Sequence, residues 1–456
     1  MWAVRSVPRT SDENYFSLAS ETSDALPWHN EADGQRCREK MEMLNAVLDV
    51  NISLVALAAV LLLIAVRQVG KKSLAIWQIM LLGAVVVLVT RQVSLTEAAA
   101  AINLDVMIFL AAMFVIGESM QESGYLLYLF NRIFKMARNP DQLVLLILFA
   151  MGFLSALLMN DTLAIIGTPL MLYLARTLKI SAKLLLLTLA FAVTIGSAMS
   201  PIGNPQNLLI AVNSGLSNPF FVFFRYLMLP TVVNLVLAYL LLRFFYRGQF
   251  QKRSLEVGSE EISDRALARL SRLSFILLFV LILAKMASVA LGATDMFRLT
   301  YIALLSALPI ILFSERRWQV ARNIDWCTLI FFAAMFVLMD AVWRSGVFQS
   351  LLAGSNADFA SVPTVLAFSV IMSQLVSNVP LVALCQPLLV HPTAEALMAL
   401  AAGSTIAGNL FILGAASNVI IIQNAEKSGE TITFLEFARV GVPLTLLNVL
   451  VYWVFI

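Results

Sequence analysis

The sequence predicts an all-α polytopic membrane protein with an inverted repeat. Each half is expected to hold five transmembrane helices and one re-entrant helical hairpin, with broken helices at the midplane. The chain of 456 residues is 60% hydrophobic and only 13% charged, and its mean hydropathy is +0.86, whereas soluble domains have about 25% charged residues. Apolar runs long enough to cross a hydrocarbon core of about 30 Å recur along the chain. Segments of the first half also match segments of the second.

Residues 1–43 differ from the rest because they are polar and lack the apolar core of a signal peptide. We expect a disordered, dispensable tail, with Met41 or Met43 as an alternative start. The three cysteines are too scattered for a disulfide framework, and the two histidines are too few for a histidine-based metal site. The net charge of +3 is modest. We expect no nucleic-acid partner, and no cofactor except Na⁺ as a coupling ion.

The apolar segments divide into crossings and hairpins. Two pairs of shorter segments are each separated by a three-residue polar break, which predicts hairpins at 141–175 and 361–392 that enter and leave on one side. The remaining segments predict ten crossings in the lipid bilayer, at 44–66, 74–90, 104–122, 184–212, 219–245, 270–292, 299–313, 325–343, 396–423 and 433–455.

Lysine and arginine residues divide unevenly between the two sides of this predicted topology. Twenty fall on one side, whereas the other side has only Arg91, Arg298 and Arg344 and five residues of the tail. The positive-inside rule makes the first side cytoplasmic. The main basic loops would then be cytoplasmic, and the C-terminus would lie outside.

Three ordered matches indicate the repeat. The segment "AAMFVIGESMQESG" (111–124) matches 333–346, "MNDTLAIIGTPL" (159–170) matches 377–388, and "TIGSAMSPIGNPQNLLI" (194–210) matches 405–421. The first repeat would cover 44–246 and the second 270–456, joined by a cytoplasmic linker at 247–269. Because each half has an odd number of crossings, the second half would be inverted, so that the hairpin tips meet near the midplane.

Four polar breaks interrupt these helices, at the two hairpin tips and inside the crossings 184–212 and 396–423. Unsatisfied backbone groups in lipid cost several kcal/mol each, so broken helices are expected to line a wet or ligand-filled cavity. Their free N-termini attract anions, and side-chain oxygens suit Na⁺. The candidate ion- and substrate-binding residues are Asn160, Asp161, Thr162, Ser200, Gly203, Asn204, Asn207, Ser377, Asn378, Gly414, Ser417 and Asn418. Those favoured for Na⁺ are Asn160, Asp161, Asn207, Asn378 and Asn418.

Several charged residues leave alternatives open. Asp161 is the only acid at a hairpin tip, and it would bind Na⁺, carry a proton or repel the wrong substrate, unless the tip is solvated. Glu118 and Asp340 occupy matching positions of the repeat, and the sequence favours neither an interfacial nor a buried location for them. Lys285 would snorkel or pair with an acid, and His391 is expected at a boundary. Each break, taken alone, is also compatible with a Pro or Gly kink.

At these breaks the chain resembles the ion transporter superfamily, which includes divalent anion:sodium symporters, citrate–metal carriers, arsenite efflux permeases and sodium/proton antiporters. The resemblance covers residues 45–456 and rests on "MNDT" (159–162), "SPIGNPQN" (200–207), "SNVP" (377–380) and "GAASN" (414–418). It is closest to bacterial inner-membrane anion permeases of unassigned substrate.

The resemblance implies a homodimer with a fixed scaffold, a moving transport domain and elevator-type alternating access. It also implies two Na⁺ sites with the substrate between them. One site would use Asn160 with Asn204 or Asn207. The other would use Ser377, Asn378 and Asn418.

The expected function is therefore secondary active transport of a small anion, an inorganic oxyanion or a carboxylate, coupled to Na⁺ or H⁺ across the plasma (inner) membrane. The symporters have Ser-Asn-Thr at the tips, whereas here the first tip has Asp161 and the second has Val379 and Pro380. The carboxylate disfavours a multiply charged anion and favours a cation, a neutral acid or a coupled proton. The alternative is an arsenite-like efflux permease or a Na⁺/H⁺ antiporter with Asp161 as the coupling carboxylate.

Two other classes are weaker. An intramembrane enzyme could pair Asp161 with Asp340, but no catalytic motif supports it, and we expect no enzyme. A passive channel would not need two inverted hairpins.

Overall fold

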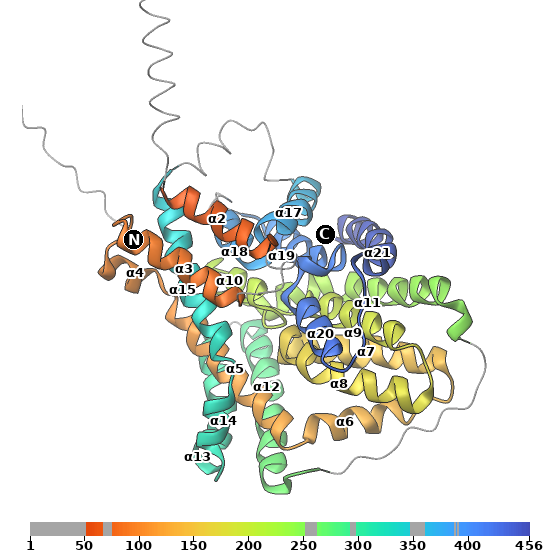
Figure 1. The fold of residues 1–456 in the computed structure, drawn as a ribbon. Coiled ribbons are helices and arrows are strands. Elements are labelled where there is room, and N and C mark those ends of the chain that lie inside the picture. The colour runs from red at the N-terminus through yellow and green to blue at the C-terminus, as the bar shows by residue number, and fades with distance from the viewer. Residues whose placement is uncertain are drawn as a thin grey trace, which may run out of the picture. The chain divides into compact units, whose positions relative to one another are not determined.

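The computed structural model describes residues 52–66, 75–250, 262–291, 298–346, 361–386, 389 and 392–456. These described residues form helices and connecting segments and contain no strand, which confirms the all-α fold class (Figure 1). The predicted tail at 1–43, His391 and the middle of the linker lie outside the described residues. Within the described part, six helices are long and apolar enough to cross a membrane, and five shorter apolar helices accompany them.

The first half of the chain contains a hairpin, whose two helices are separated by the single residue Met159, and a helix that is broken in its middle. The hairpin predicted at 141–175 is formed by α7 and α8, and the predicted broken helix is formed by α9 and α10. In chain order the elements are α2 (Ile52–Val66), α3 (Ile76–Val89), α4 (Leu95–Ala101), α5 (Leu104–Glu122), α6 (Tyr125–Phe134), α7 (Pro140–Leu158), α8 (Asn160–Leu178), α9 (Ala182–Ser197), α10 (Pro205–Asn213), α11 (Pro219–Phe245) and η1 (Arg247–Gln249).

The second half follows the same order. Its hairpin is formed by α17 and α18, and its broken helix by α19 and α20 with two 3₁₀ turns between them. The elements are α12 (Arg265–Ala290), α13 (Leu299–Phe313), α14 (Arg317–Asn323), α15 (Trp326–Arg344), α17 (Val362–Val376), α18 (Asn378–Cys385), α19 (Ala394–Ile406), η3 (Ala407–Asn409), η4 (Ile412–Gly414), α20 (Ala416–Glu426) and α21 (Phe434–Phe455).

Contacts between the halves occur twice, with the roles of corresponding helices exchanged: α3 and α5 correspond to α13 and α15, and α8 and α10 correspond to α18 and α20. Helix α3 packs on α15, and α5 packs on α13; likewise α8 packs on α20, and α10 packs on α18 (Figure 1). Within each half the first arm of the hairpin packs on the broken helix, α7 on α9 and α17 on α19. The matching order and the exchanged contacts agree with two related halves. Their inverted orientation stays a prediction.

Short sequence signals fix where the main helices begin. The dipeptide Asn-Pro starts α7, α10 and α11, and in each case the Asn side chain accepts a hydrogen bond from the backbone two residues beyond the proline, at 2.9–3.2 Å. Proline suits the first helical position because its missing N–H would have no partner there. The short helices α4, α6 and α14 are too short or too polar to appear in a search for membrane-crossing segments.

Ion pairs at the edges of the bundle join residues that the sequence assigns to the same side. On the predicted cytoplasmic side the pairs are Lys183–Glu436, Arg243–Asp141 and Arg316–Asp264, and on the opposite side they are Arg298–Asp105 and Arg344–Glu97. The Arg344 Nε also lies 2.7 Å from the Asp340 carboxylate, so Asp340 is part of this peripheral cluster. These pairs agree with the predicted grouping of loops, whereas the sidedness itself stays a prediction.

Close packing between α7 and α9 places the first hairpin beside the broken helix. A Cβ on Gly196 of α9 would lie 2.1 Å from the carbonyl oxygen of Gly152 on α7. The contact is backbone to backbone, so no side chain can move to make room. Small residues at such crossings let helices approach closely in membranes.

We predict that Gly196→Ala destabilises the protein by roughly 1–3 kcal/mol, as overpacking does in a well-packed core. The loss should appear although alanine is the better helix former by about 1 kcal/mol. Thermal unfolding in detergent would measure it. Gly248→Ala is the matched control, because a Cβ there meets nothing within 4 Å. An equal melting temperature for the two variants would contradict the packing described above.

Candidate functional site

The two hairpins turn through the same unusual backbone conformation. Met159 at the first tip has φ 68° and ψ 139°, and Ser377 at the second has φ 71° and ψ 156°. Both residues lie at matched positions of the internal repeat. A residue other than glycine in this region costs about 1–3 kcal/mol, and it persists only where the surroundings impose it. Both hairpins therefore keep a strained turn, directly before Asn160 and Asn378.

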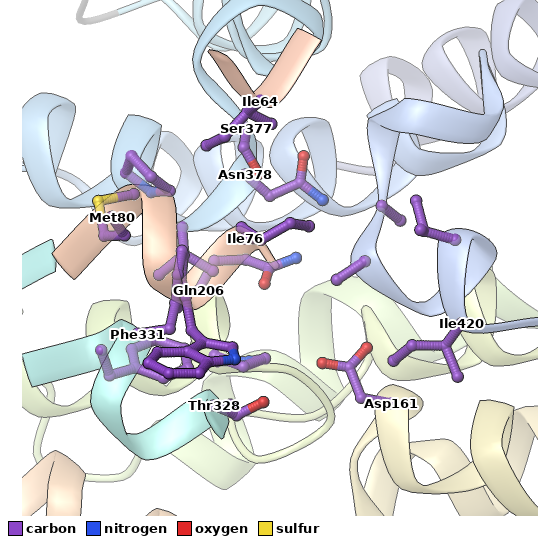
Figure 2. A pocket seen from close by; sticks show the side chains of 18 of the residues that line it. Ile64, Ile76, Met80, Asp161, Gln206, Thr328, Phe331, Ser377, Asn378 and Ile420 are labelled. Atoms are coloured by element: carbon purple, nitrogen blue, oxygen red, sulfur yellow. The ribbon is translucent and has the colours of Figure 1, made fainter. Parts of the chain in front are cut away.

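A cavity of about 370 Å³ lies where the two tips and the two helix breaks meet. Figure 2 shows its polar side chains, among them Asp161, Gln206, Thr328 and Asn378, facing a common space. Apolar side chains from α2, α3, α15 and α20 complete the wall, and they include Ile64, Ile76, Met80, Phe331 and Ile420. The cavity is thus polar on the side of the tips and breaks and apolar on the side of α2 and α3.

At the hairpin tips and helix breaks, four helices begin in this wall, namely α8, α10, α18 and α20; the first turns of α3 and α15 also line the cavity. The side chain of Asn204 caps α10, whereas no side chain hydrogen-bonds to the N-terminal turn of α8, α18 or α20 from the N-cap position. Uncapped first turns keep backbone N–H groups available and carry partial positive charge. In α8, however, the Asn160 N–H donates to the Gly203 carbonyl and the Asp161 N–H donates to Asn160 Oδ1. Two helix N-termini, those of α18 and α20, therefore add partial positive charge to the wall without a basic side chain.

The charged side chains of the cavity wall are acidic. Asp161 and Asp325 both line it, and none of its described lining residues is Lys, Arg or His. The Asp325 carboxylate accepts hydrogen bonds from the Thr328 backbone N–H at 3.0 Å and from the Thr328 hydroxyl at 2.6 Å, so it is occupied as the N-cap of α15. In contrast, Oδ1 of Asp161 is buried without a hydrogen-bond partner among the described residues.

Other buried oxygens at the second hairpin are also unpaired. The Asn378 Oδ1 and the Ser373 hydroxyl have no partner in the described part of the chain, and both residues line the cavity. Asn378 is only 7% exposed. Because unpaired buried polar groups are costly, these oxygens and Asp161 Oδ1 are buried atoms at the wall with capacity for a further ligand.

Asparagine side chains satisfy the freed backbone of the first break. Asn207 Nδ2 lies 3.1–3.3 Å from the carbonyl oxygens of Ser197, Ala198 and Ser200. Asn204 Nδ2 donates to the Ser197 hydroxyl at 3.0 Å, and its Oδ1 caps α10. Both side chains are fully buried. Their hydrogen-bonding capacity is used within the protein.

The second break is held in the same way by one asparagine. Asn418 Nδ2 donates to the Gly408 carbonyl at 2.6 Å, ten residues earlier in the chain, as Asn207 does to Ser197. Both glycines of the breaks approach backbone. A Cβ on Gly203 would lie 2.3 Å from Ser197 O, and one on Gly414 would lie 2.6 Å from Ala407 O.

The first tip is tied to both breaks. The Asn160 backbone N–H donates to the Gly203 carbonyl at 2.9 Å, and its Nδ2 lies 3.5 Å from the Ser417 hydroxyl. Its Oδ1 accepts from the Asp161 backbone N–H at 3.0 Å. These contacts place Asp161 at the cavity wall, between the two halves of the chain.

The structure brings together only part of the residue set predicted from the sequence. Four of those residues line the cavity: Asn160, Asp161, Ser377 and Asn378. Thr162 instead packs against Gly117 of α5. The remaining residues lie in the breaks but not in the cavity wall, namely Ser200, Gly203, Asn204, Asn207, Gly414, Ser417 and Asn418.

Sequence reasoning also missed several polar residues of the wall, namely Gln206, Asp325, Thr328, Ser373, Gln374 and Gln423. Gln206 stands inside "SPIGNPQN" and had a visible signal. Asp325 and Thr328 had only the pattern of a helix N-cap, which says nothing about a cavity. Glu118, Asp340 and Lys285 do not line the cavity, and Lys285 is buried on α12.

Comparison with known proteins relates this chain to a family of transporters. A sequence model of a family described as "Citrate transporter" matches residues 59–396. The 46 kDa membrane protein of Mycobacterium leprae is 29% identical over 372 residues, which cover 76% of this chain and 84% of that protein. The silicon efflux transporter LSI3 of Oryza sativa subsp. japonica is 26% identical over 438 residues, covering 80% and 89%.

One solved structure supports the fold. The YdaH transporter of Alcanivorax borkumensis superposes with a TM-score of 0.54 over 89% of this chain and 97% of that one, at 14% sequence identity. A likeness at this identity concerns the arrangement of helices alone.

The strained tip gives a prediction about stability. We expect Ser377→Gly to raise the free energy of unfolding by about 1 kcal/mol, because glycine adopts positive φ without steric cost. Ser377→Ala removes the same hydroxyl but keeps the strain, so it should give no gain. Thermal unfolding in detergent would compare the two variants. Equal stabilities would show that Ser377 is not strained.

Proposed function

The chain belongs to the citrate transporter family, and from that premise we propose that it is a secondary active transporter of a small anion, an inorganic oxyanion or a carboxylate, coupled to Na⁺ or H⁺. The family and the relatives named as transporters make it a membrane transporter rather than an enzyme. The observation that carries the finer proposal is the cavity, which is formed jointly by both hairpin tips and both helix breaks.

The proposed anion would bind to backbone rather than to basic side chains. The first turns of α18 and α20 begin at the cavity wall, and no N-cap side chain hydrogen-bonds to them. Such N-termini bind anions through backbone N–H groups and the helix dipole. A site of this kind releases its ligand more readily than a buried arginine cluster would, which suits transport.

The proposed coupling follows from the charge of Asp161. An anion beside an ionised carboxylate is repelled, and the repulsion grows as water is excluded. A Na⁺ ion at the unpaired oxygens of Asp161 and Asn378, or a proton on Asp161, would remove that repulsion. Asn160 lines the cavity beside Asp161, and Asn418 Oδ1 is buried without a hydrogen-bond partner among the described residues, so the proposal keeps both as further ligands of such an ion. The side chain of Asn207 already serves the first break and would act indirectly.

An elevator-type movement is part of the proposal. One wall of the cavity comes from the tips and breaks, and the opposite wall comes from apolar side chains of α2 and α3. An apolar wall makes no directional bonds, so the hairpins and broken helices could slide along it as a unit. We propose a homodimer in the plasma (inner) membrane, with the main basic loops cytoplasmic and the C-terminus outside.

A second candidate function is efflux of an oxyacid in its neutral form. The favouring observation is that two carboxylates and no basic side chain line the described cavity. A neutral species such as arsenous or silicic acid would meet no repulsion there. The rice relative carries the name of a silicon efflux transporter. Asp161 would then be the group that exchanges Na⁺ or H⁺ against the cargo.

We predict that purified protein in liposomes takes up at least one of citrate, phosphate, arsenite or silicic acid when a Na⁺ or H⁺ gradient is imposed. Asp161→Asn should abolish the dependence of flux on the gradient, because an amide carries neither the charge nor the proton. Asp105→Asn is the matched control, since Asp105 pairs with Arg298 outside the cavity. Isotope uptake with and without each gradient is the measurement.

The outcomes separate the two candidates. Gradient-driven uptake of citrate or phosphate supports anion transport, whereas gradient-driven flux of only arsenous or silicic acid supports the second candidate. If flux depends on the gradient to the same extent in the Asp161→Asn and Asp105→Asn variants, Asp161 has no part in the coupling. If no gradient drives any of the four fluxes, the proposed function is wrong.

A further inference from the structure

Thr405 lies on α19 in the second half of the chain, yet its hydroxyl contacts the break of the first half. Its Oγ1 is 3.1 Å from Asn204 Nδ2, 3.5 Å from Gln206 Nε2 and 3.4 Å from Asn207 Oδ1. Thr405 is 1% exposed, so these bonds are shielded from bulk water. One hydroxyl therefore meets three amide side chains that are about 200 residues away in sequence.

These three contacts use the full capacity of a hydroxyl. An alcohol has one donor and two acceptor lone pairs. Thr405 accepts from the amides of Asn204 and Gln206 and donates to the carbonyl of Asn207. No alternative orientation of the O–H satisfies all three groups. The hydroxyl thus fixes which end of each amide faces Thr405.

Of the three amides, only Gln206 belongs to the cavity wall. It is 3% exposed and stands at the start of α10, opposite the hairpin tips in Figure 2. A glutamine side chain has several rotatable bonds, and ordering it costs up to about 2 kcal/mol of conformational entropy. A hydrogen-bond partner that holds Nε2 would order the Gln206 side chain in the ligand-free protein, so ligand binding would not lose that entropy.

The matched residue of the other half lacks this role. Thr194 pairs with Thr405 in the internal repeat, and it is as deeply buried, at 1% exposure. Its hydroxyl has no hydrogen-bond partner among the described residues. Two of the three partner positions differ, because those corresponding to Asn204 and Gln206 are Ala415 and Ser417; the third is kept as Asn418, whose Oδ1 also has no partner among the described residues. The chain therefore contains its own control for Thr405.

We propose that Thr405 is a positioning residue of the binding cavity, whose hydroxyl holds the Gln206 amide in the orientation that contacts the transported anion. This role rests on the proposed function. The affinity for the anion at Gln206, in the first half of the chain, would then depend on Thr405 in the second half. Gln206 would contact the anion directly, and Thr405 would act only through the amides that it orients.

The test compares variants in the liposome assay, with the member of the set citrate, phosphate, arsenite and silicic acid that the wild type moves fastest. Thr405→Val should raise the half-saturating concentration about threefold to tenfold, the effect of losing one hydrogen bond, with a smaller change in maximal rate. Thr405→Ser keeps the hydroxyl and should restore affinity. Thr194→Val removes an unpaired hydroxyl and should leave the half-saturating concentration unchanged.

A double variant distinguishes positioning from a general structural effect. In a Gln206→Met background, Thr405→Val should add no further change in half-saturating concentration, because its target amide is already gone. If Thr405→Val does not give a monodisperse protein, Thr405→Cys replaces it, since a thiol forms weaker hydrogen bonds in nearly the same volume.

Equal half-saturating concentrations for the Thr405 and Thr194 variants, or independent effects of Thr405 and Gln206, would overturn the positioning role while leaving the proposed function intact. Wild-type protein that moves none of the four solutes would overturn both proposals.

Discussion

A helix that breaks inside a membrane frees backbone groups that lipid cannot satisfy, and the centre of this protein depends on how those groups are paired. Asn207 and Asn418 each donate to a carbonyl ten residues earlier, and the Gly203 carbonyl accepts from the Asn160 backbone. The freed carbonyls thus turn inward and find protein partners. The freed N–H groups of α18 and α20 remain at the cavity wall. The proposed anion site rests on this separation.

The sequence predicted where the helices break but not what each side chain does there. Both tips and both breaks lie where the polar runs are, since polar backbone at membrane depth has few permitted places. Asn204 and Asn207 were expected to face a ligand, but the structure assigns their hydrogen bonds to the backbone and to Thr405. Such roles depend on contacts between residues about 200 positions apart. A pattern read along one chain does not contain them, and the same holds for Asp325 and Thr328, which reach the cavity from α15.

The two halves share a plan and differ in chemistry. In the first break Asn204 caps α10 and Thr405 orders the amides, whereas in the second break Ala415 leaves α20 uncapped and the Thr194 hydroxyl is unpaired. The first half therefore supplies ordered side chains, and the second supplies an open helix N-terminus. This difference follows the sequence, since Asn204 and Gln206 of "SPIGNPQN" correspond to Ala415 and Ser417 of "GAASN".

The central claim is that the transported anion occupies the cavity between the hairpin tips. Cys327 provides a direct test, because this free cysteine lines the cavity, whereas Cys385 is buried. In a Cys37→Ser background, the rate of Cys327 alkylation by N-ethylmaleimide would be measured by mass spectrometry with and without the transported anion. We predict that a saturating concentration of the anion slows the reaction severalfold. An unchanged alkylation rate at a concentration that saturates transport would contradict the claim.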